Sequence, residues 1–201
     1  VIAIAYLTGS NPLQLLQQVG TDTSISEPAQ SGNPPGNDSE REFVAAILGD
    51  TEDAWSGIFS AAGQRYQPPK LVLFRDAVES ACGFNSAAVG PFYCPPDQRV
   101  YLDLSFFHEL HQRFGAPGDF AQAYVIAHEV GHHVQNLLGI SRQVDQMRRQ
   151  AGQSEANALS VLVELQADCF AGIWGRHAQG RNLLEEGDLE EGLRAAQAVG
   201  D

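Results

Sequence analysis

The sequence contains few basic residues, few cysteines and no long hydrophobic run. Lysine and arginine number 12 against 25 aspartate and glutamate residues, and the net charge of the 201 residues is −13. Nucleic-acid binding needs a basic surface, so this balance argues against a nucleic-acid partner. It also disfavours adsorption to anionic lipid. Neither an internal repeat nor a Gly-rich phosphate-binding loop occurs, and an apolar fraction of 43% is enough for the core of one ordinary domain.

The three cysteines are Cys82, Cys94 and Cys169, and no CxxC pair occurs, so the sequence does not suggest a zinc ribbon. Cys82 and Cys94 flank a short segment that contains glycine and proline. This spacing suits a disulfide that closes a hairpin, although two unrelated thiols are the alternative. Such a disulfide requires an oxidising compartment. Cys169 lies in an apolar helical run, so we expect a small buried core residue there.

The first 40 residues offer little apolar material for a core. Val1–Leu7 is apolar but far shorter than the roughly 20 residues that cross a bilayer, so it fits either the end of a longer anchor or a short buried strand. Asn11–Val19 begins with the Asn-Pro pair of a short helix, and Thr21–Asn37 has the composition of a linker or surface loop. We therefore divide the chain into residues 1–40, an anchor remnant with a short helix and linker, and a main domain over residues 41–201.

The main domain alternates helical and extended segments. Helices are expected over 38–48, 51–62, 106–114, 118–139, 141–151, 154–176 and 187–198, and strands over 70–75, 86–93 and 99–104. Thr51, Ser141 and Ser154 are the expected N-caps. Gly90-Pro91 favours an edge position for 86–93, because proline cannot donate to a strand ladder. The predicted fold class is α+β, mainly helical with a small, mostly antiparallel sheet.

The helix expected over 118–139 contains His128-Glu129-Val130-Gly131-His132, an H-E-x-x-H motif. Residues four apart share a helix face, so His128 and His132 can direct two imidazoles at one ion. Glu129 is placed beside them to hold a water on that ion. Two imidazoles and a third protein ligand leave zinc one open position, which is the catalytic arrangement. The alternative is a helix whose histidines lie on a solvated face.

The third ligand is expected on the helix over 154–176, where Glu164 and Asp168 lie in an apolar run. Carboxylates in such a setting are costly unless they are paired or bind a metal. Glu164 can ligate zinc, and Asp168 can accept a hydrogen bond from the distal ring nitrogen of His128. Alternatively, both carboxylates line the polar side of the helix. Competing third ligands are Cys94, Asp145 and Glu155, and a Cys94 ligand would indicate a deformylase-like amide hydrolase unless the disulfide forms.

Four blocks of the sequence resemble the bacterial neutral zinc metallopeptidase family, the YpfJ-like proteins. The blocks are Val89–Asp97, Val100–Phe107, Ala123–Gln135 and Glu164–Gly172, within a resemblance that covers about residues 41–201. It implies a zincin-like, gluzincin-like fold that binds one Zn²⁺ per chain through His128, His132 and Glu164, with Glu129 as the general base. It also implies an extracytoplasmic domain, periplasmic or at the cell surface, that meets the membrane only through an N-terminal anchor. Family members usually continue past Gly200-Asp201 with a further histidine-containing segment.

These residues predict a zinc metallopeptidase that acts on a peptide or protein substrate. Glu129 would take a proton from the attacking water and deliver it to the leaving amine. The substrate would add as a strand to the extended segment 86–93. Tyr124, His133 and His177 are candidates for contacts to the oxyanion or the substrate, although core packing or a surface position explains each of them more simply. A catalytically inactive, peptidase-like binding module on the cell exterior is the alternative function, and a membrane-associated structural protein is a third.

Overall fold

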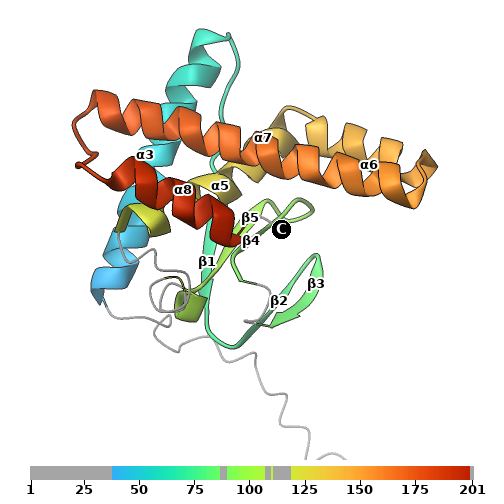
Figure 1. Cartoon of the computed structure of the whole chain (residues 1–201), viewed down its shortest axis with the longest axis horizontal. Helices are drawn as coiled ribbons and strands as arrows, with labels where there is room; N and C mark the ends of the chain where they lie inside the picture. Colours follow the sequence, from blue (N-terminus) through green and yellow to red (C-terminus); the bar gives the residue numbers. More distant parts are fainter. Residues whose placement is uncertain (1–37, 87–89, 107–109, 111–118, 200–201) are drawn as a thin grey trace, which may run out of the picture. The chain divides into compact units, whose positions relative to one another are not determined.

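A computed structural model describes residues 38–86, 90–106, 110 and 119–199 (Figure 1). All of them belong to the compact unit Pro34–Asp201. The segments expected at Val1–Leu7, Asn11–Val19 and Thr21–Asn37 lie outside the described residues, as does most of 106–114. The elements are α3 (Asp38–Ala61), β1 (Lys70–Phe74), β2 (Ala77–Ser80), β3 (Gly83–Ser86), β4 (Phe92–Cys94), β5 (Arg99–Asp103), α5 (Asp119–Leu137), α6 (Ile140–Gln150), α7 (Gln153–Gly180) and α8 (Asp188–Val199).

Helix α5 is the centre of this unit. It packs against α3, α6, α7 and α8 and against strands β4 and β5 (Figure 1). A helix that is apolar on nearly every side is stable only where other elements cover it. Its buried apolar residues are Ala121, Ala123, Tyr124, Val125, Ile126, Ala127, Val130 and Val134. The helix predicted over 118–139 is therefore confirmed, and the H-E-x-x-H motif lies in the core.

The three-stranded sheet has the order β1-β5-β4, and β2 and β3 form a separate antiparallel pair. Strand β5 is parallel to β1 and antiparallel to β4, so the sheet is mixed rather than mostly antiparallel as predicted. The chain forms β2, β3 and β4 before it returns beside β1, and a long connection of this kind is what parallel pairing requires. The predicted segments 70–75 and 99–104 are confirmed as β1 and β5.

Strand β4 lies at the edge of the sheet, since it pairs with β5 alone among the described strands. The predicted extended segment 86–93 is divided in the structure: Ser86 ends β3, Phe92 begins β4, and residues 87–89 lie outside the described part. A disulfide between Cys82 and Cys94 joins the turn of the β2–β3 hairpin to the end of β4. The predicted disulfide is confirmed, and it ties the hairpin to the edge strand.

The predicted break at 49–51 does not occur, because α3 runs without interruption from Asp38 to Ala61. The Thr51 hydroxyl donates to the carbonyl oxygen of Leu48 at 2.7 Å, which satisfies it inside the helix instead of at a cap. Asp50 is held on the side of the helix, where its carboxylate accepts a hydrogen bond from Trp174 Nε1 at 2.6 Å. Tertiary contacts thus keep in helical form a segment whose composition favours a turn.

Ser141 and Ser154 are not the N-caps that the sequence suggested. Helix α6 begins one residue earlier, after Gly139 in the left-handed conformation, and α7 begins after Gly152; neither cap makes a side-chain hydrogen bond. Cys169 is exposed rather than buried. The buried residues of α7 are Ala167, Ala171, Trp174 and Ala178, and Cys169 lies on another face of the helix. The helix predicted over 187–198 is confirmed as α8.

Candidate metal centre

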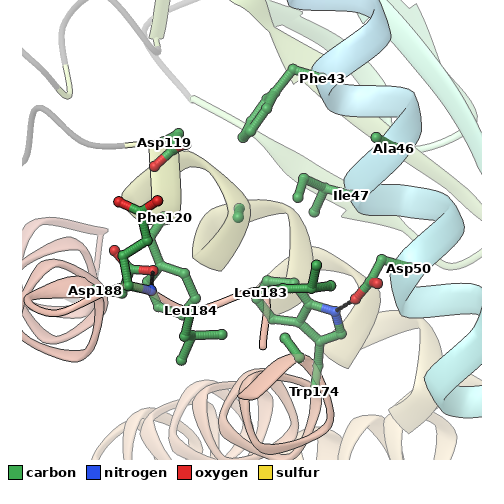
Figure 2. Close-up of a pocket in the computed structure, with 13 residues that line it drawn as sticks. Phe43, Ala46, Ile47, Asp50, Asp119, Phe120, Trp174, Leu183, Leu184 and Asp188 are labelled. Atoms are coloured by element: carbon green, nitrogen blue, oxygen red, sulfur yellow. Dashed lines mark hydrogen bonds between the residues drawn. The ribbon is translucent and has the colours of Figure 1, made fainter. Parts of the chain in front are cut away.

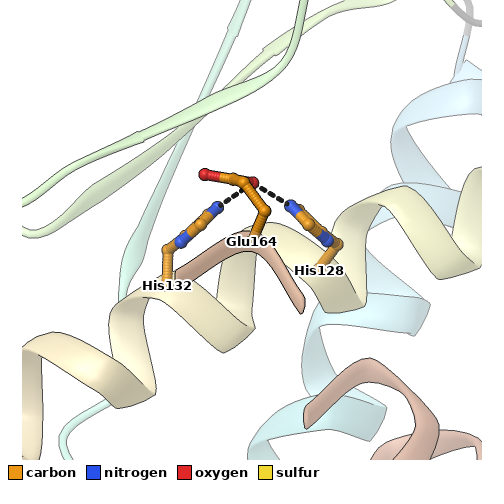
Figure 3. Close-up of side chains that lie close together, drawn as sticks. All are labelled: His128, His132 and Glu164. Atoms are coloured by element: carbon orange, nitrogen blue, oxygen red, sulfur yellow. Dashed lines mark hydrogen bonds and ion pairs between the residues drawn. The ribbon is translucent and has the colours of Figure 1, made fainter. Parts of the chain in front are cut away.

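Two helices bring three metal-ligating side chains together. His128 and His132 project from α5, and Glu164 reaches between them from α7 (Figure 3). Both histidine Nε2 atoms lie 3.3 Å from Glu164 Oε2. The three potential ligand atoms all lie within 4.8 Å of one another. Ligands bound to tetrahedral zinc at about 2.1 Å stand about 3.4 Å apart, so these side chains fit a zinc ion.

Gly131 allows the two helices to approach closely enough for this arrangement. A Cβ atom built on Gly131 would lie 2.9 Å from the carbonyl oxygen and 3.1 Å from the Cα atom of Ala167. No side chain other than hydrogen fits there without a shift of backbone. On α5, Gly131 lies between His128 and His132. On α7, Ala167 lies three residues after Glu164. The close approach of the two helices at this contact therefore sets the distance from Glu164 to the two histidines. The sequence signal for Gly131 was a glycine inside an apolar helix, which often marks a close approach.

Hydrogen bonds fix the orientation of both imidazoles. His128 Nδ1 lies 2.9 Å from Asp168 Oδ1, and His132 Nδ1 lies 3.0 Å from Gln135 Oε1. Because both partners are acceptors, each Nδ1 carries the proton and each Nε2 faces Glu164. The Tyr124 hydroxyl donates to the same Asp168 oxygen. Asp168 therefore lies where the sequence analysis placed it, beside the distal nitrogen of His128.

Gln135 has a role that the sequence analysis missed. Its side chain is 1% exposed, and its amide nitrogen donates to the carbonyl oxygen of Val163 at 2.7 Å and to Gln166 Oε1 at 3.1 Å. Gln135 thus links the ring of His132 to the α7 backbone next to Glu164. The available signal was its position three residues after His132, on the same helix face.

Glu129 is buried beside the ligand group, with 7% of its surface exposed. Burial raises the pKa of its carboxyl group above the ordinary value, while His132 and His128 oppose that shift. The backbone N–H of Tyr93 donates to the Glu129 carboxylate. Because this N–H is directed at Glu129 rather than at β5, the side of β4 that no described strand covers borders Glu129. A buried carboxyl group with a raised pKa, beside two potential metal-ligating histidines, is suited to accept and return a proton.

The ligand group concentrates negative charge around the two imidazoles. Burial alone lowers the pKa of His128, but hydrogen bonds with Asp168 and Glu164 outweigh it and raise the pKa to about 10. The pKa of His132 is also raised, because its hydrogen bond with Glu164 and the charge of Glu129 outweigh burial. Hydrogen bonds with His128 and His132 hold the pKa of Glu164 well below its usual range. The cluster therefore favours a positive charge, whether protons or a metal ion supply it.

The three candidate oxyanion or substrate contacts have other partners or positions. Tyr124 donates to Asp168, and His133 is fully buried, with its ring nitrogens bonded to the Tyr93 hydroxyl at 2.9 Å and the Gln67 carbonyl oxygen at 2.6 Å. His177 is exposed in the last turn of α7, about 20 Å along the helix axis from Glu164 at 1.5 Å per residue. These placements argue against all three as free donors at the metal centre. The role of His133 is to hold β4 against α5.

The competing third ligands do not join the group. Cys94 is bonded to Cys82, which removes the thiolate that a deformylase-like site would need. Asp145 on α6 and Glu155 in the first turn of α7 are both exposed. The sequence predicted an apolar setting for Glu164, but its side chain is 52% exposed.

A cavity of about 290 Å³ lies between α3, α5, α7 and the segment before α8, and it contains none of the predicted site residues (Figure 2). Its walls are mainly apolar and include Phe43, Ile47, Phe120, Trp174, Leu183 and Leu184. Asp119 and Asp188 at its edge form an acidic group with Glu191. All three acidic residues lie in the first turns of α5 and α8, where carboxylates stabilise the helix dipole. We therefore assign them a structural role.

A buried helix with two histidines, a facing carboxylate and an adjacent glutamate defines a candidate metal site of the H-E-x-x-H type in a mainly helical α+β fold. The chain belongs to the family described as "Putative neutral zinc metallopeptidase", whose model matches residues 1–201.

Two curated relatives are similar to the chain over most of its length. The chain is 51% identical over 195 residues to the Escherichia coli K12 "Uncharacterized protein YpfJ", a match that covers 97% of this chain and 65% of the relative. It is 41% identical over 177 residues to the Mycobacterium bovis "Uncharacterized protein Mb2605", which covers 83% of this chain and 58% of that protein. The chain thus spans about two thirds of the length of its E. coli relative. No solved structure matches the chain.

Proposed function

We propose that the chain is a zinc-dependent metallopeptidase with one zinc ion on His128, His132 and Glu164. The observation that supports this most directly is that both histidine Nε2 atoms lie 3.3 Å from the same Glu164 oxygen. A structural zinc site has four protein ligands, whereas this group has three among the described residues, which leaves one position for water or substrate. The buried Glu129 beside the group has no use in a purely structural site.

When bound, zinc would activate a water molecule and polarise the carbonyl group of the peptide bond. Glu129 takes the proton of the attacking water and delivers it to the leaving amine. Burial of the Glu129 carboxyl group favours the protonated form that exists between these two transfers. Asp168 and Gln135 keep the two imidazoles directed at the metal throughout, because each holds the Nδ1 proton of one ring.

A peptide substrate would bind along the free side of β4. An extended peptide can add a strand to a sheet edge through main-chain hydrogen bonds. The Tyr93 N–H contacts Glu129, so this side of β4 leads directly to the proposed general base. The buried His133–Tyr93–Asn136 hydrogen bonds hold the strand against α5 and so fix its distance from the metal ligands.

The proposed location is outside the cytoplasm, at a membrane to which an N-terminal anchor holds the protein. The Cys82–Cys94 disulfide supports an oxidising compartment. Among the described residues, α7 alone is long and apolar enough to cross a membrane by length and composition. Its Glu164 and Asp168 belong to the metal centre, however, so α7 is a component of the folded domain.

The test is the Glu129→Gln variant, with Glu155→Gln as a matched control on the exposed start of α7. Wild type and both variants should bind about one zinc ion per chain, measured by elemental analysis. Glu129→Gln should lower cleavage of an unfolded protein substrate by about 10²–10⁴-fold, because the general base is lost. Glu155→Gln should cleave like wild type.

Three outcomes would contradict the proposal. Unchanged cleavage by Glu129→Gln would remove the general-base assignment. A wild-type chain that holds zinc and cleaves nothing in a broad peptide library would favour the peptide-binding module instead. Glu164→Ala should lose zinc and cleavage together, and full zinc retention in that variant would place the third ligand elsewhere.

A further inference from the structure

Helix α7 is apolar on two faces, and the rest of the described chain covers one of them. The covered face contains Ala167, Ala171, Trp174 and Ala178. The other presents large apolar side chains to solvent: Val161 is 52% exposed, Leu162 61%, Leu165 56% and Ile173 36%. Such a row is unusual, because a helix that is apolar on all sides is normally buried. We therefore expect an apolar ligand to cover part of this face.

The exposed face begins at the metal centre. Successive residues of a helix are separated by about 100° around its axis, so Asp168 lies about 40°, Val161 about 60° and Leu165 about 100° from Glu164 in the same direction. Leu162 lies about 160° from Glu164, on nearly the opposite side of α7. Val161 and Leu165 are thus the first apolar side chains that a molecule bound at Glu164 would meet on α7.

We propose that Val161 and Leu165 form an apolar wall that selects peptides with a large apolar residue beside the scissile bond. This inference rests on the proposed peptidase function and names its substrate class. A substrate residue such as leucine or phenylalanine would cover both side chains, and burial of one large apolar side chain favours binding by about 10–100-fold. A charged residue would lose water against Val161 and Leu165 without a partner. An acidic residue would also be repelled by the carboxylates of the metal centre.

A second copy of the chain fits this face less well. The four large side chains expose on the order of 400 Å² together, which is about half of the roughly 800 Å² per partner that a stable interface buries. Their distribution is also uneven, because only Val161 and Leu165 adjoin the metal ligands. The two occupants predict different effects at Leu162, which a substrate side chain at the metal centre would not reach but a second copy would cover.

The experiment measures peptide binding to the zinc-loaded Glu129→Gln chain, which should hold substrates without cleaving them. Two fluorescent peptides are compared that differ at one central position, leucine in one and glutamine in the other, in an otherwise Ala/Ser sequence. Val161→Lys and Leu165→Lys are each added to Glu129→Gln, and Leu162→Lys is the matched control at an equally exposed position. Milder variants, Val161→Thr and Leu165→Gln, guard against unfolding, and thermal melting confirms that each variant is folded.

The leucine peptide should bind about 10-fold or more tightly than the glutamine peptide. Val161→Lys and Leu165→Lys should remove this preference, whereas Leu162→Lys should keep it within about twofold. Equal binding of the two peptides would overturn the proposal, and so would equal losses in all three lysine variants. A dimeric chain that both Val161→Lys and Leu162→Lys convert to a monomer, measured by light scattering, would instead make this face an interface between copies.

Cleavage by the wild-type chain separates this inference from the proposed function. Hydrolysis of both peptides at equal rates, without a binding preference, would support the peptidase function and contradict the apolar wall. A clear binding preference without hydrolysis of either peptide would contradict the peptidase function, and the apolar wall would then belong to a peptide-binding site.

Discussion

Gln135 is the residue whose substitution tests how the metal ligands are oriented. Gln135→Met should keep the side-chain volume but remove the acceptor that holds the His132 Nδ1 proton. The ring can then rotate or adopt the other tautomer, so zinc affinity should fall about 10–100-fold. The measurement is competition for zinc against a chelator of known affinity. Gln146→Met, at an exposed position on α6, is the control and should bind zinc like wild type.

Equal zinc affinity in Gln135→Met and wild type would show that the α5–α7 packing alone orients His132. His132 and Gln135 also differ in how far the sequence predicts their roles. The spacing of His128 and His132 is enough to place two imidazoles on one helix face. Gln135 lies three residues after His132 on the same helix face, but this spacing does not reveal its full role, which also depends on the Val163 carbonyl oxygen of another helix.

At the scale of elements, the contact between α5 and α7 sets the geometry of the metal centre. Gly131→Ala would place a methyl group 2.9 Å from the Ala167 carbonyl oxygen. The helices must then separate, which should lower the free energy of unfolding by about 1–3 kcal/mol. Zinc affinity should fall as well, because Glu164 moves away from the histidines. Chemical denaturation and chelator competition measure the two effects.

Gly57→Ala on α3 is the matched control for this substitution, since nothing lies within 4 Å of the Cβ position there. Alanine has the higher helix propensity, so this variant should be as stable as wild type or more stable by up to about 1 kcal/mol. Wild-type zinc affinity in Gly131→Ala would contradict the assigned role of the glycine, whatever its stability.

The elements differ in how far their sequences determine them. Helix α5 and strands β1 and β5 follow from their own apolar patterns, and each is found where it was predicted. The continuity of α3 could not be predicted, because Gly49-Asp50-Thr51 has the composition of a turn and Trp174 holds Asp50 from α7. The parallel pairing of β1 with β5 was equally hidden, since it depends on the path of the chain between them. The exposure of Cys169 depends on which face of α7 meets α5.

At the scale of the whole molecule, the metal centre links stability to pH. In the metal-free chain the pKa of His128 is raised from 6.5 to about 10. A raised folded-state pKa means that protonated His128 stabilises the fold fully below about pH 6.5, and that this stabilisation is lost as the pH rises toward 10. The pKa values of Glu164 and Asp168 are lowered, so their contribution is present at neutral pH and is lost in acid. The metal-free chain should therefore lose stability on the alkaline side as well as in acid.

Zinc must displace the His128 proton, so the stabilisation that zinc provides should depend on pH over the same range. The difference in melting temperature between the zinc-bound and the chelated chain should widen from pH 6.5 to 9, because the competing proton becomes easier to remove. Histidines of ordinary pKa would give a difference that levels off above about pH 7.5. Calorimetry at a buffered zinc concentration distinguishes the two curves.

His177→Ala, which removes an exposed histidine outside the cluster, should reproduce the wild-type curve, whereas His128→Ala should show little stabilisation by zinc at any pH. A wild-type curve that levels off near pH 7.5 would mean that Asp168 and Glu164 do not hold a proton on His128 in the metal-free chain, and the charge of the cluster would then have to be balanced in another way.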